Sequence, residues 1–443
     1  MNTRVIEVRI WGKSVGAVAA DPTSGAYVFR YDDAWLRSGI ELAPLMMRLD
    51  ARPPSFVFPG LPESYKRLPG LLSDALPDAF GNALIDAWMA KQGVSKGSVT
   101  ALDRLAYMGK RGMGALEFRP AKGSQKESAE PIAMQRLVEA ARNVVHGRIA
   151  DDEHAQAALA NIIRVGTSAG GARAKAVVAW NEATGELRSG QFDTAPGFSH
   201  WLLKFDGMGK DFELGLSGGY GRIEYAYYLM ATAAGVAMSR CHLLEENGRA
   251  HFMTQRFDRD GNVKHHVQSL CAMQHLDYML RHVHAYEQLF LTLRDLGLGP
   301  EAAEQVFRRM AFNVMARNCD DHTKNHALLL REGGAWSLAP AYDVTHAHNP
   351  KGEWTAEHLM SVNGKFDGIT RGDLIEVGDR FGVPSFSKAI DEVAAALGRW
   401  REFAGKAGLP PSRIEEIEKE FVLLKSPSGF GRKRSAKLMQ NGR

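Results

Sequence analysis

Residues 318–325 read Asn-Cys-Asp-Asp-His-Thr-Lys-Asn and place the acid Asp320 five positions before the amide Asn325. A second acid, Asp343, ends the stretch Ala-Pro-Ala-Tyr-Asp at 339–343. One carboxylate can accept a hydroxyl proton, while an amide oxygen and a second carboxylate are the hard ligands that Mg²⁺ prefers. The spacing predicts a catalytic loop and a metal-binding turn for phosphoryl transfer. Acid-rich loops after helices are also common, so the short motif alone leaves an ordinary loop open.

The flanking residues predict elements that would bring the two motifs together. Residues Pro300–Arg317 have the apolar spacing of an amphipathic helix, with proline in its first turn. The polar run that follows reads as a loop. Short apolar strands at His326–Leu330 and Trp336–Leu338 flank a Gly-Gly turn. A hairpin of this kind would place Asn325 close to Asp343.

A second segment, Val165–Lys175, is rich in glycine and small residues and precedes the apolar stretch Ala176–Trp180. Such residues let backbone N–H groups approach a phosphate closely. The segment is not a Walker A loop, because Ala172 stands where that motif needs lysine. A flexible turn before a strand is the alternative interpretation.

Lys204 interrupts the apolar stretch Trp201–Phe205. A buried lysine is rare without a partner. A phosphate is one candidate partner, and Glu224 on a predicted helix at about Arg222–Ala234 is another. A lysine on an edge strand that faces water is the third possibility.

These motifs follow one another in the order found in protein kinases. Together they resemble the HipA family of serine/threonine kinases, the toxin components of bacterial type II toxin–antitoxin modules. The resemblance covers about residues 5–400 and rests on these segments: Phe58–Glu63, Leu76–Gly81, Val165–Lys175, Trp201–Phe205, Gln255–Arg259, Asp320–Asn325 and Ala339–Asp343.

The resemblance implies a role for each matching residue. Asp320 would be the catalytic residue, and Asn325 and Asp343 would bind Mg²⁺. Gln255 and Phe257 would form the hinge that faces adenine. The full set implied to contact ATP is Gly166, Thr167, Ser168, Gly170, Gly171, Lys175, Lys204, Gln255, Phe257, Asp258, His322, Asn325 and Asp343, with Asp258 near the ribose and Lys204 on the phosphates.

Ser168 matches the serine that family members autophosphorylate, and Thr167 is an alternative acceptor. Modification in those members ejects the loop and stops the kinase. A phosphate of about −1.5 to −2 charge could not share the loop with the phosphates of ATP.

The chain departs from the family pattern at three places. Ala174 stands where proline or glutamate often precedes the lysine, and Asp321 stands where a small residue is frequent. The metal turn reads Tyr-Asp-Val at 342–344, which fits this family and differs from the Asp-Phe-Gly of typical eukaryotic kinases. These differences bear on substrate choice and rate more than on the fold.

Bulk properties agree with a folded, soluble protein that we expect in the cytoplasm. The chain has 443 residues, 45% hydrophobic content and a net charge of +4, which permits docking beside nucleic acid without requiring it. Three cysteines leave an odd count, so no disulfide framework is expected. The histidines lack the spacing of a zinc site. No apolar run reaches the length of a membrane span.

We therefore predict an α+β, two-lobed protein-kinase-like fold with a small β-rich and helical N-terminal domain. The predicted divisions are an N-terminal domain at 1–125, a nucleotide-binding lobe at 126–260, a helical catalytic lobe at 261–425, and a flexible basic tail at 426–443. The resemblance implies ATP and Mg²⁺ as cofactors, a HipB-like helix-turn-helix antitoxin as partner, and an aminoacyl-tRNA synthetase as substrate. DNA would be contacted only through the antitoxin.

Two other functional classes stay open. Antibiotic kinases also use an Asp-x-x-x-x-Asn loop, so a small-molecule phosphotransferase is one alternative, although the N-terminal region and the loop at Ser168 argue against it. The other is a non-catalytic partner of a DNA-binding antitoxin that represses transcription, a role that can coexist with kinase activity.

Overall fold

The computed structural model describes residues 3–122, 133–145, 174–207, 210–211, 215–216 and 218–424. The glycine loop with Gly166, Thr167, Ser168, Gly170 and Gly171 lies outside the described residues. So do the basic tail at 426–443 and most of the polar linker at 121–130. The proposed domain divisions stay predictions.

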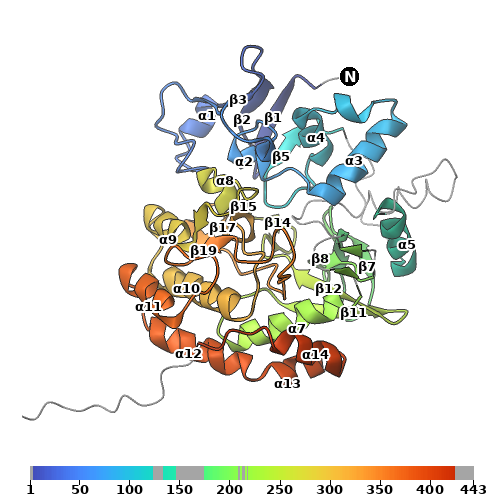
Figure 1. The fold of residues 1–443 in the computed structure, drawn as a ribbon. Helices are drawn as coiled ribbons and strands as arrows, with labels where there is room; N and C mark the ends of the chain where they lie inside the picture. The colour runs from blue at the N-terminus through green and yellow to red at the C-terminus, as the bar shows by residue number, and fades with distance from the viewer. Residues whose placement is uncertain are drawn as a thin grey trace, which may run out of the picture.

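The N-terminal region is built on an antiparallel five-stranded sheet with the order β4-β3-β2-β1-β5 (Figure 1). In β1 the side chains of Ile6, Val8 and Ile10 are fully buried and alternate with more exposed neighbours, so one face of the sheet packs on the core. This alternation is typical of a strand with one buried face. The strands are β1 (Val5–Ile10), β2 (Lys13–Ala20), β3 (Tyr27–Tyr31), β4 (Ser55–Val57) and β5 (Glu117–Arg119).

Short helices fill the chain between β3 and β5. They are α1 (Asp33–Leu36), η1 (Glu63–Tyr65), α2 (Gly70–Ser73), α3 (Ala79–Lys91), η2 (Lys96–Ser98) and α4 (Ala101–Met108). At the start of α4, the Thr100 side chain accepts from the Asp103 backbone N–H and Asp103 accepts from the Thr100 backbone N–H. This reciprocal cap satisfies two N–H groups that the helix would leave unpaired.

A second antiparallel sheet, with the order β11-β12-β8-β6-β7, carries the predicted phosphate-binding lysine. The helix α7 packs against β12 on one side and against α13 on the other. The elements of this region are α5 (Met134–Val145), β6 (Lys175–Trp180), β7 (Leu187–Ser189), β8 (Ser199–Lys204), β9 (Lys210–Asp211), β10 (Gly215–Leu216), α7 (Tyr220–Ala233), β11 (Cys241–Glu246) and β12 (Arg249–Gln255).

The remaining chain is mostly helical and includes a three-stranded antiparallel sheet, β15-β17-β18 (Figure 1). Its helices are α8 (Leu270–Gln274), α9 (Tyr286–Asp295), α10 (Pro300–Met315), η3 (Thr323–Asn325), α11 (Arg371–Arg380), α12 (Phe386–Leu397), α13 (Trp400–Lys406) and α14 (Pro411–Glu418). Its strands are β13 (Arg259–Asp260), β14 (Val263–Lys264), β15 (His266–Ser269), β16 (His284–Ala285), β17 (Ala327–Leu330), β18 (Trp336–Leu338) and β19 (Met360–Ser361).

The hairpin expected between the two predicted Mg²⁺ ligands is present. The helix α10 begins at Pro300 and ends at Met315, and the strands β17 and β18 pair antiparallel, with Leu328 opposite Leu338. Asn325 lies just before this hairpin, and Asp343 follows it. The amphipathic pattern and the turn residues were enough to predict this unit.

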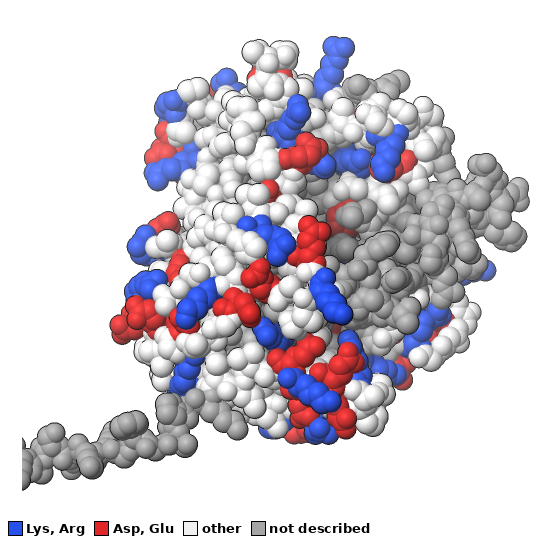
Figure 2. Space-filling model, viewed as in Figure 1, with Lys and Arg blue, Asp and Glu red and all other residues white. Residues whose placement is uncertain are grey.

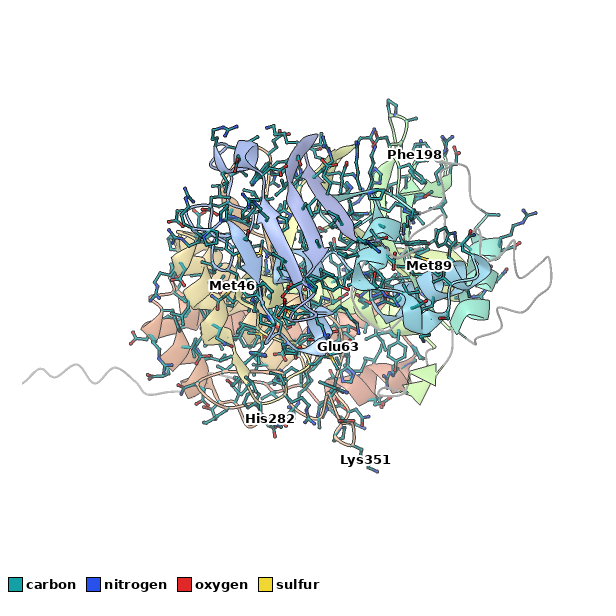
Figure 3. The ribbon with its side chains drawn as sticks, turned by 90° about the horizontal axis from the view of Figure 1, so that it is seen from above. Met46, Glu63, Met89, Phe198, His282 and Lys351 are labelled. Carbon is teal, nitrogen blue, oxygen red and sulfur yellow. The ribbon has the colours of Figure 1, made fainter. Side chains whose placement is uncertain are left out.

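Two large hydrophobic cores organise the described residues. One contains β1 residues such as Ile6 together with Val178 and Trp201 of the second sheet, so the N-terminal sheet and the second sheet share it. The other joins α7 to the helical region, with Tyr227 and Trp400 in contact at 5.5 Å between ring centroids. Seen from above, the N-terminal sheet lies over the middle of the molecule, with Met89 to one side (Figure 3).

The charged surface mixes both signs. On the face shown in Figure 2, acidic and basic side chains are interspersed, and they are dense over the lower part of the molecule. Ion pairs such as Arg401–Glu418 and Lys406–Glu402 join neighbouring side chains on α13 and α14. Charges of both signs therefore lie side by side on this face. Among the residues that the structure describes, no helix has both the length and the apolar character needed to span a bilayer.

The N-terminal region docks on α8 through polar contacts and close packing. Asp74 accepts from the backbone N–H and the hydroxyl of Ser269, the residue that caps α8. The backbone N–H of Gly70 donates to His275 Nε2 at 3.0 Å. A Cβ atom at Gly70 would lie 2.4 Å from the carbonyl oxygen of Ala272, so only glycine allows this approach.

We expect Gly70→Ala to destabilise this docking by about 1–3 kcal/mol, because the added methyl overlaps backbone atoms that cannot move aside cheaply. Gly60→Ala is the matched control, since a Cβ there meets nothing within 4 Å. Urea unfolding of the purified protein measures both. Equal urea concentrations at the unfolding midpoints of the two variants would contradict the close packing of α2 on α8.

Candidate active site

Lys204, the last residue of β8, lies between two carboxylates. Its ammonium nitrogen is 2.5 Å from Glu224 Oε1 on α7 and also forms an ion pair with Asp343. The three side chains are 12%, 3% and 24% exposed, respectively. The sequence left a phosphate, Glu224 and water as candidate neighbours of Lys204, and in this structure Glu224 is one of its partners.

The charges in this triad stabilise one another. Burial alone would raise the pKa of Asp343. The ammonium groups of Lys204 and Lys175 together outweigh burial, so the pKa of Asp343 is below its ordinary value. Burial lowers the pKa of Lys204, but Asp343 and Glu224 outweigh that effect and raise it above the ordinary value. Lys204 and Asp343 are therefore both charged at neutral pH.

Asp343 is held in an unusual backbone conformation. Its φ is +52°, in the left-handed region that aspartate tolerates better than most residues. The neighbouring Tyr342 hydroxyl donates to the Lys324 carbonyl oxygen at 2.7 Å, which ties this turn to the catalytic loop. The Ala341 backbone N–H donates to Ala237, next to α7. Strained backbone that is fixed on both sides is typical of functional positions.

The predicted catalytic loop, residues 318–325, presents Asp320 to solvent. Its side chain is 49% exposed, and His322 Nε2 lies 3.8 Å from its carboxylate. The side-chain nitrogen of Asn325 donates to the Asp320 carbonyl oxygen at 2.7 Å. That bond directs the amide nitrogen inward and leaves the amide oxygen as the group that can bind a cation. Asn325 and Asp343 also line one pocket, so the structure brings the two predicted Mg²⁺ ligands together.

Lys175 contacts the N-terminal region. The residue is paired with Lys204 across β6 and β8, and its side chain is only 2% exposed. Its ammonium nitrogen lies 3.1 Å from Asp78 Oδ2, and Asp78 is 4% exposed and caps α3. Burial raises the pKa of Asp78, and Lys175 opposes that shift. A carboxylate of the N-terminal region therefore reaches the predicted phosphate site.

The predicted hinge lies at the end of β12. Gln255 is the last residue of that strand and is paired with Trp201 of β8. The ring of Phe257 packs against Tyr342, with 5.8 Å between ring centroids. The hinge therefore touches the turn that carries Asp343.

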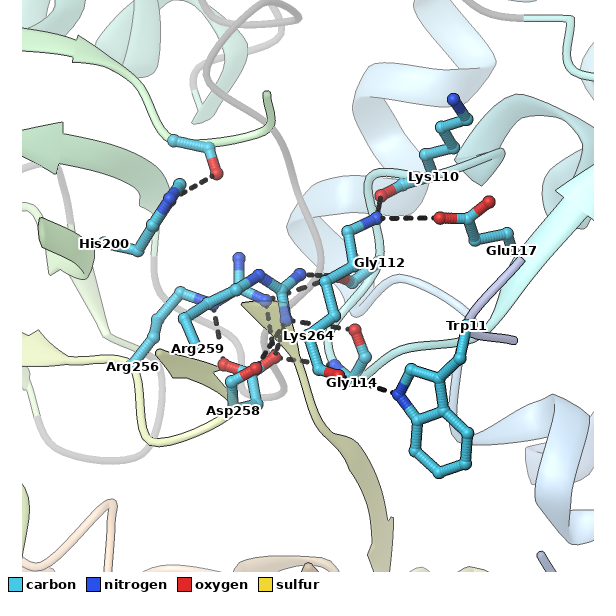
Figure 4. A network of polar contacts seen from close by, with 11 residues as sticks. Trp11, Lys110, Gly112, Gly114, Glu117, His200, Arg256, Asp258, Arg259 and Lys264 are labelled. Carbon is cyan, nitrogen blue, oxygen red and sulfur yellow. Dashed lines mark hydrogen bonds and ion pairs between the residues drawn. The ribbon is translucent and has the colours of Figure 1, made fainter. Parts of the chain in front are cut away.

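Asp258 has a different environment from the one expected. Its side chain is fully buried, and it pairs with Arg256 at 2.6 Å and with Arg259 at 2.7 Å (Figure 4). It also accepts from the Gly114 backbone N–H at 2.7 Å. Burial raises the pKa of Asp258, but the two guanidinium groups lower it well below its ordinary range. These contacts give Asp258 a structural role, and its place near the ribose stays a prediction.

The same network joins the N-terminal region to the hinge (Figure 4). Arg259 donates to the carbonyl oxygens of Gly112 and Gly114. Lys264 donates to the Lys110 carbonyl oxygen, and Trp11 donates to the Lys264 carbonyl oxygen. The turn at 110–114 is therefore bonded to the chain that leaves β12.

Sequence reasoning did not identify two charged residues near the site as functional candidates, Asp78 and Lys324. Lys324 lies 5.0 Å from the centroid of the Tyr278 ring. Burial lowers the pKa of Lys324, but Asp74, Tyr278 and other nearby groups raise it above its ordinary value. Their signal was present, since Asp78 lies within Leu76–Gly81 and Lys324 within the catalytic motif. A short motif does not predict which distant side chains Asp78 and Lys324 contact in the fold.

Comparisons with known proteins agree with this geometry. The family model described as "HipA-like C-terminal domain" matches residues 167–422, and the model described as "HipA N-terminal domain" matches residues 6–119. Among curated proteins, none matches this chain.

Two solved structures are similar to the chain. A Shewanella oneidensis HipA, solved with HipB and its operator DNA, has 17% identity and a TM-score of 0.64, covering 94% of this chain and 95% of that one. A Helicobacter pylori proinflammatory kinase, CtkA, has 9% identity and a TM-score of 0.33, covering 52% of this chain and 86% of that one. The first similarity supports the fold, and the second is too weak to add to it.

The chain thus has the two-lobed, kinase-like fold that the sequence predicts, with an N-terminal region docked on both lobes. The two HipA family models together match more than half of the length of this chain. The chain belongs to the HipA family.

We expect Asp258→Asn to lower the free energy of unfolding by about 3–5 kcal/mol, because it leaves two buried guanidinium groups without their carboxylate. Arg256 and Arg259 are only 1% and 6% exposed. Asp260→Asn, at an exposed position two residues away, is the matched control. Chemical denaturation measures stability, and calorimetric titration measures ATP affinity. A variant of unchanged stability that binds ATP weakly would contradict the structural role and support the ribose assignment.

Proposed function

We propose that this chain is an ATP- and Mg²⁺-dependent serine/threonine protein kinase. The observation that carries the proposal is Lys204, held between Glu224 and Asp343, with the catalytic loop of Asp320 and Asn325 beside it. Phosphoryl transfer needs positioned cations and a group that orients the attacking hydroxyl, and this arrangement supplies both.

Each residue has a distinct task in this proposal. Asp320, exposed at the loop, accepts a hydrogen bond from the substrate hydroxyl and orients it toward the phosphate. Lys204 binds nucleotide phosphates. Asn325 and Asp343 offer an amide oxygen and a carboxylate, a donor set that fits Mg²⁺. When bound, the ion would neutralise phosphate charge.

Other residues complete the nucleotide site. Gln255 and Phe257 line the adenine side, and His322 lies by the phosphates. Lys175 fixes the end of the glycine loop that contains Gly166, Thr167, Ser168, Gly170 and Gly171. Autophosphorylation of Ser168, with Thr167 as the alternative acceptor, would be the off-switch, because the added charge repels the phosphates of ATP.

The family membership supports a cellular role as a toxin. We infer that the protein acts in the cytoplasm on an aminoacyl-tRNA synthetase, so that phosphorylation blocks translation and arrests growth. A HipB-like helix-turn-helix antitoxin would be its partner and would provide the contact with DNA. The similar Shewanella protein was solved with HipB and operator DNA, which supports such an assembly here.

Incubation of the purified chain with ATP and Mg²⁺, followed by mass spectrometry, tests the proposal. We expect a phosphate on Ser168 or Thr167 in the wild type. Asp320→Ala should reduce incorporation by about 10²–10⁴-fold, because the group that orients the hydroxyl is lost. That variant should keep the thermal shift induced by ATP, whereas Asp343→Ala should lose both activity and metal-dependent binding.

Asp379→Ala, at an exposed position on α11, is the control and should behave as the wild type. If the wild type neither incorporates phosphate nor shows a thermal shift with ATP, the kinase proposal fails. Binding of ATP without self-modification would instead favour transfer to another acceptor, which a panel of proteins and small molecules would identify.

A further inference from the structure

A buried polar network lies directly behind the exposed Asp320. The next residue, Asp321, has a fully buried side chain, whereas the side chain of Asp320 is 49% exposed. Residues 319–322 form neither a helix nor a turn. Cys319 is also fully buried, so Cys319 and Asp321 face inward while Asp320 faces outward.

Three donors hold the carboxylate of Asp321. The Tyr286 hydroxyl donates to Oδ2 at 2.8 Å, and the Leu359 backbone N–H donates to Oδ1 at 2.8 Å. His358 Nδ1 lies 2.9 Å from Oδ2. A buried carboxylate needs such partners, because burying a charge without compensation is costly. The donors come from α9 and from the segment that precedes β19.

One imidazole contacts the residues on both sides of Asp320. The side chain of His358 is 2% exposed, with Nδ1 on Asp321 and Nε2 3.9 Å from Cys319 Sγ. Burial lowers the pKa of His358, but the Asp321 carboxylate outweighs it and raises the pKa to about 10. The ring is therefore an imidazolium at neutral pH, and it balances the negative charge buried beside Asp320.

The network continues to the end of α10. The Asn313 side chain donates to the Tyr286 hydroxyl oxygen at 2.9 Å, and Asn318 donates to Asn313 Oδ1 at 2.9 Å. The Cys319 backbone N–H donates to the Ala347 carbonyl oxygen at 2.9 Å. The loop is thus held at Asn318, Cys319 and Asp321, and these contacts leave the side chain of Asp320 accessible.

We propose that His358 is a positioning residue for phosphoryl transfer, which fixes the backbone of the catalytic loop by holding Asp321 and Cys319 so that Asp320 faces the substrate. The proposal rests on the proposed kinase function. Among the described residues, the side chain of His358 contacts Asp321 and Cys319, so its effect is on the geometry of the loop. A displacement of about 1 Å at a reacting group can cost about a hundredfold in rate.

The test compares His358→Ala with His266→Ala in the full chain. His266 is a second buried histidine, at the far end of β15 beside Trp336, and burial lowers its pKa to about 4. Three quantities are measured for each: hydrogen–deuterium exchange of the peptide 318–325, the rate of self-phosphorylation at saturating ATP, and the KM for ATP. Exchange needs no activity, so it tests the loop even if the kinase proposal fails.

We expect His358→Ala to raise exchange in the loop and to lower the rate at saturating ATP by about tenfold to a hundredfold, with the KM for ATP within about twofold. His266→Ala should lose stability with neither change. His358→Asn keeps a donor near Nδ1 and should recover part of the rate. If His358→Ala does not fold, His358→Asn is compared with His266→Ala instead, and we expect smaller changes in loop exchange and rate.

Equal loop exchange in the two alanine variants would overturn the positioning role, whatever the activity. So would an unchanged rate in His358→Ala, or a loss of rate that His266→Ala reproduces. A wild-type protein without transferase activity would remove the kinase proposal, and the exchange data would then decide the structural part alone.

Discussion

The ammonium group of Lys204 is the charge on which the arrangement of the site depends. A lysine this deeply buried is stable only when carboxylates surround it, and Glu224 and Asp343 meet that need from two different segments. The strand β8, the helix α7 and the turn after β18 each contribute one of these three charged side chains. Pairing the ammonium group with its two carboxylates therefore also brings the three segments together. The electrostatic requirement of one side chain thereby sets the position of a predicted metal ligand.

The N-terminal region takes part in the same arrangement. Asp78 meets Lys175 at the start of β6, Asp258 binds the turn at Gly114, and Asp74 holds the cap of α8. These contacts lie on the sheet, the hinge and the helical region, respectively. A domain that is bonded to all three restricts their relative motion. The N-terminal region is therefore tied to each part of the predicted nucleotide site.

Local patterns predicted the elements well, and long-range partners poorly. The helix at Pro300, the strand of Lys204 and the hairpin before Asp343 follow from apolar periodicity and turn residues, which act within a few positions. The fold class and the family followed from the order of the motifs. The arginine partners of Asp258 could not be predicted, because a motif position does not say whether an acid faces a ligand or a buried arginine. Asp78 was missed for the same reason, since its partner Lys175 lies far along the chain.

The contrast between Asp320 and Asp321 shows why neighbouring acids can have opposite tasks. Asp320 is exposed and can meet a substrate hydroxyl, whereas Asp321 is buried and compensated by His358, Tyr286 and a backbone N–H. If the charge of Asp321 were not balanced, two close carboxylates would each favour protonation of the other. The contacts with these three groups hold the inner carboxylate in place, and the outer carboxylate stays exposed. In our proposal, the buried pair of Asp321 and His358 fixes the loop so that the carboxylate of Asp320 can remain in water.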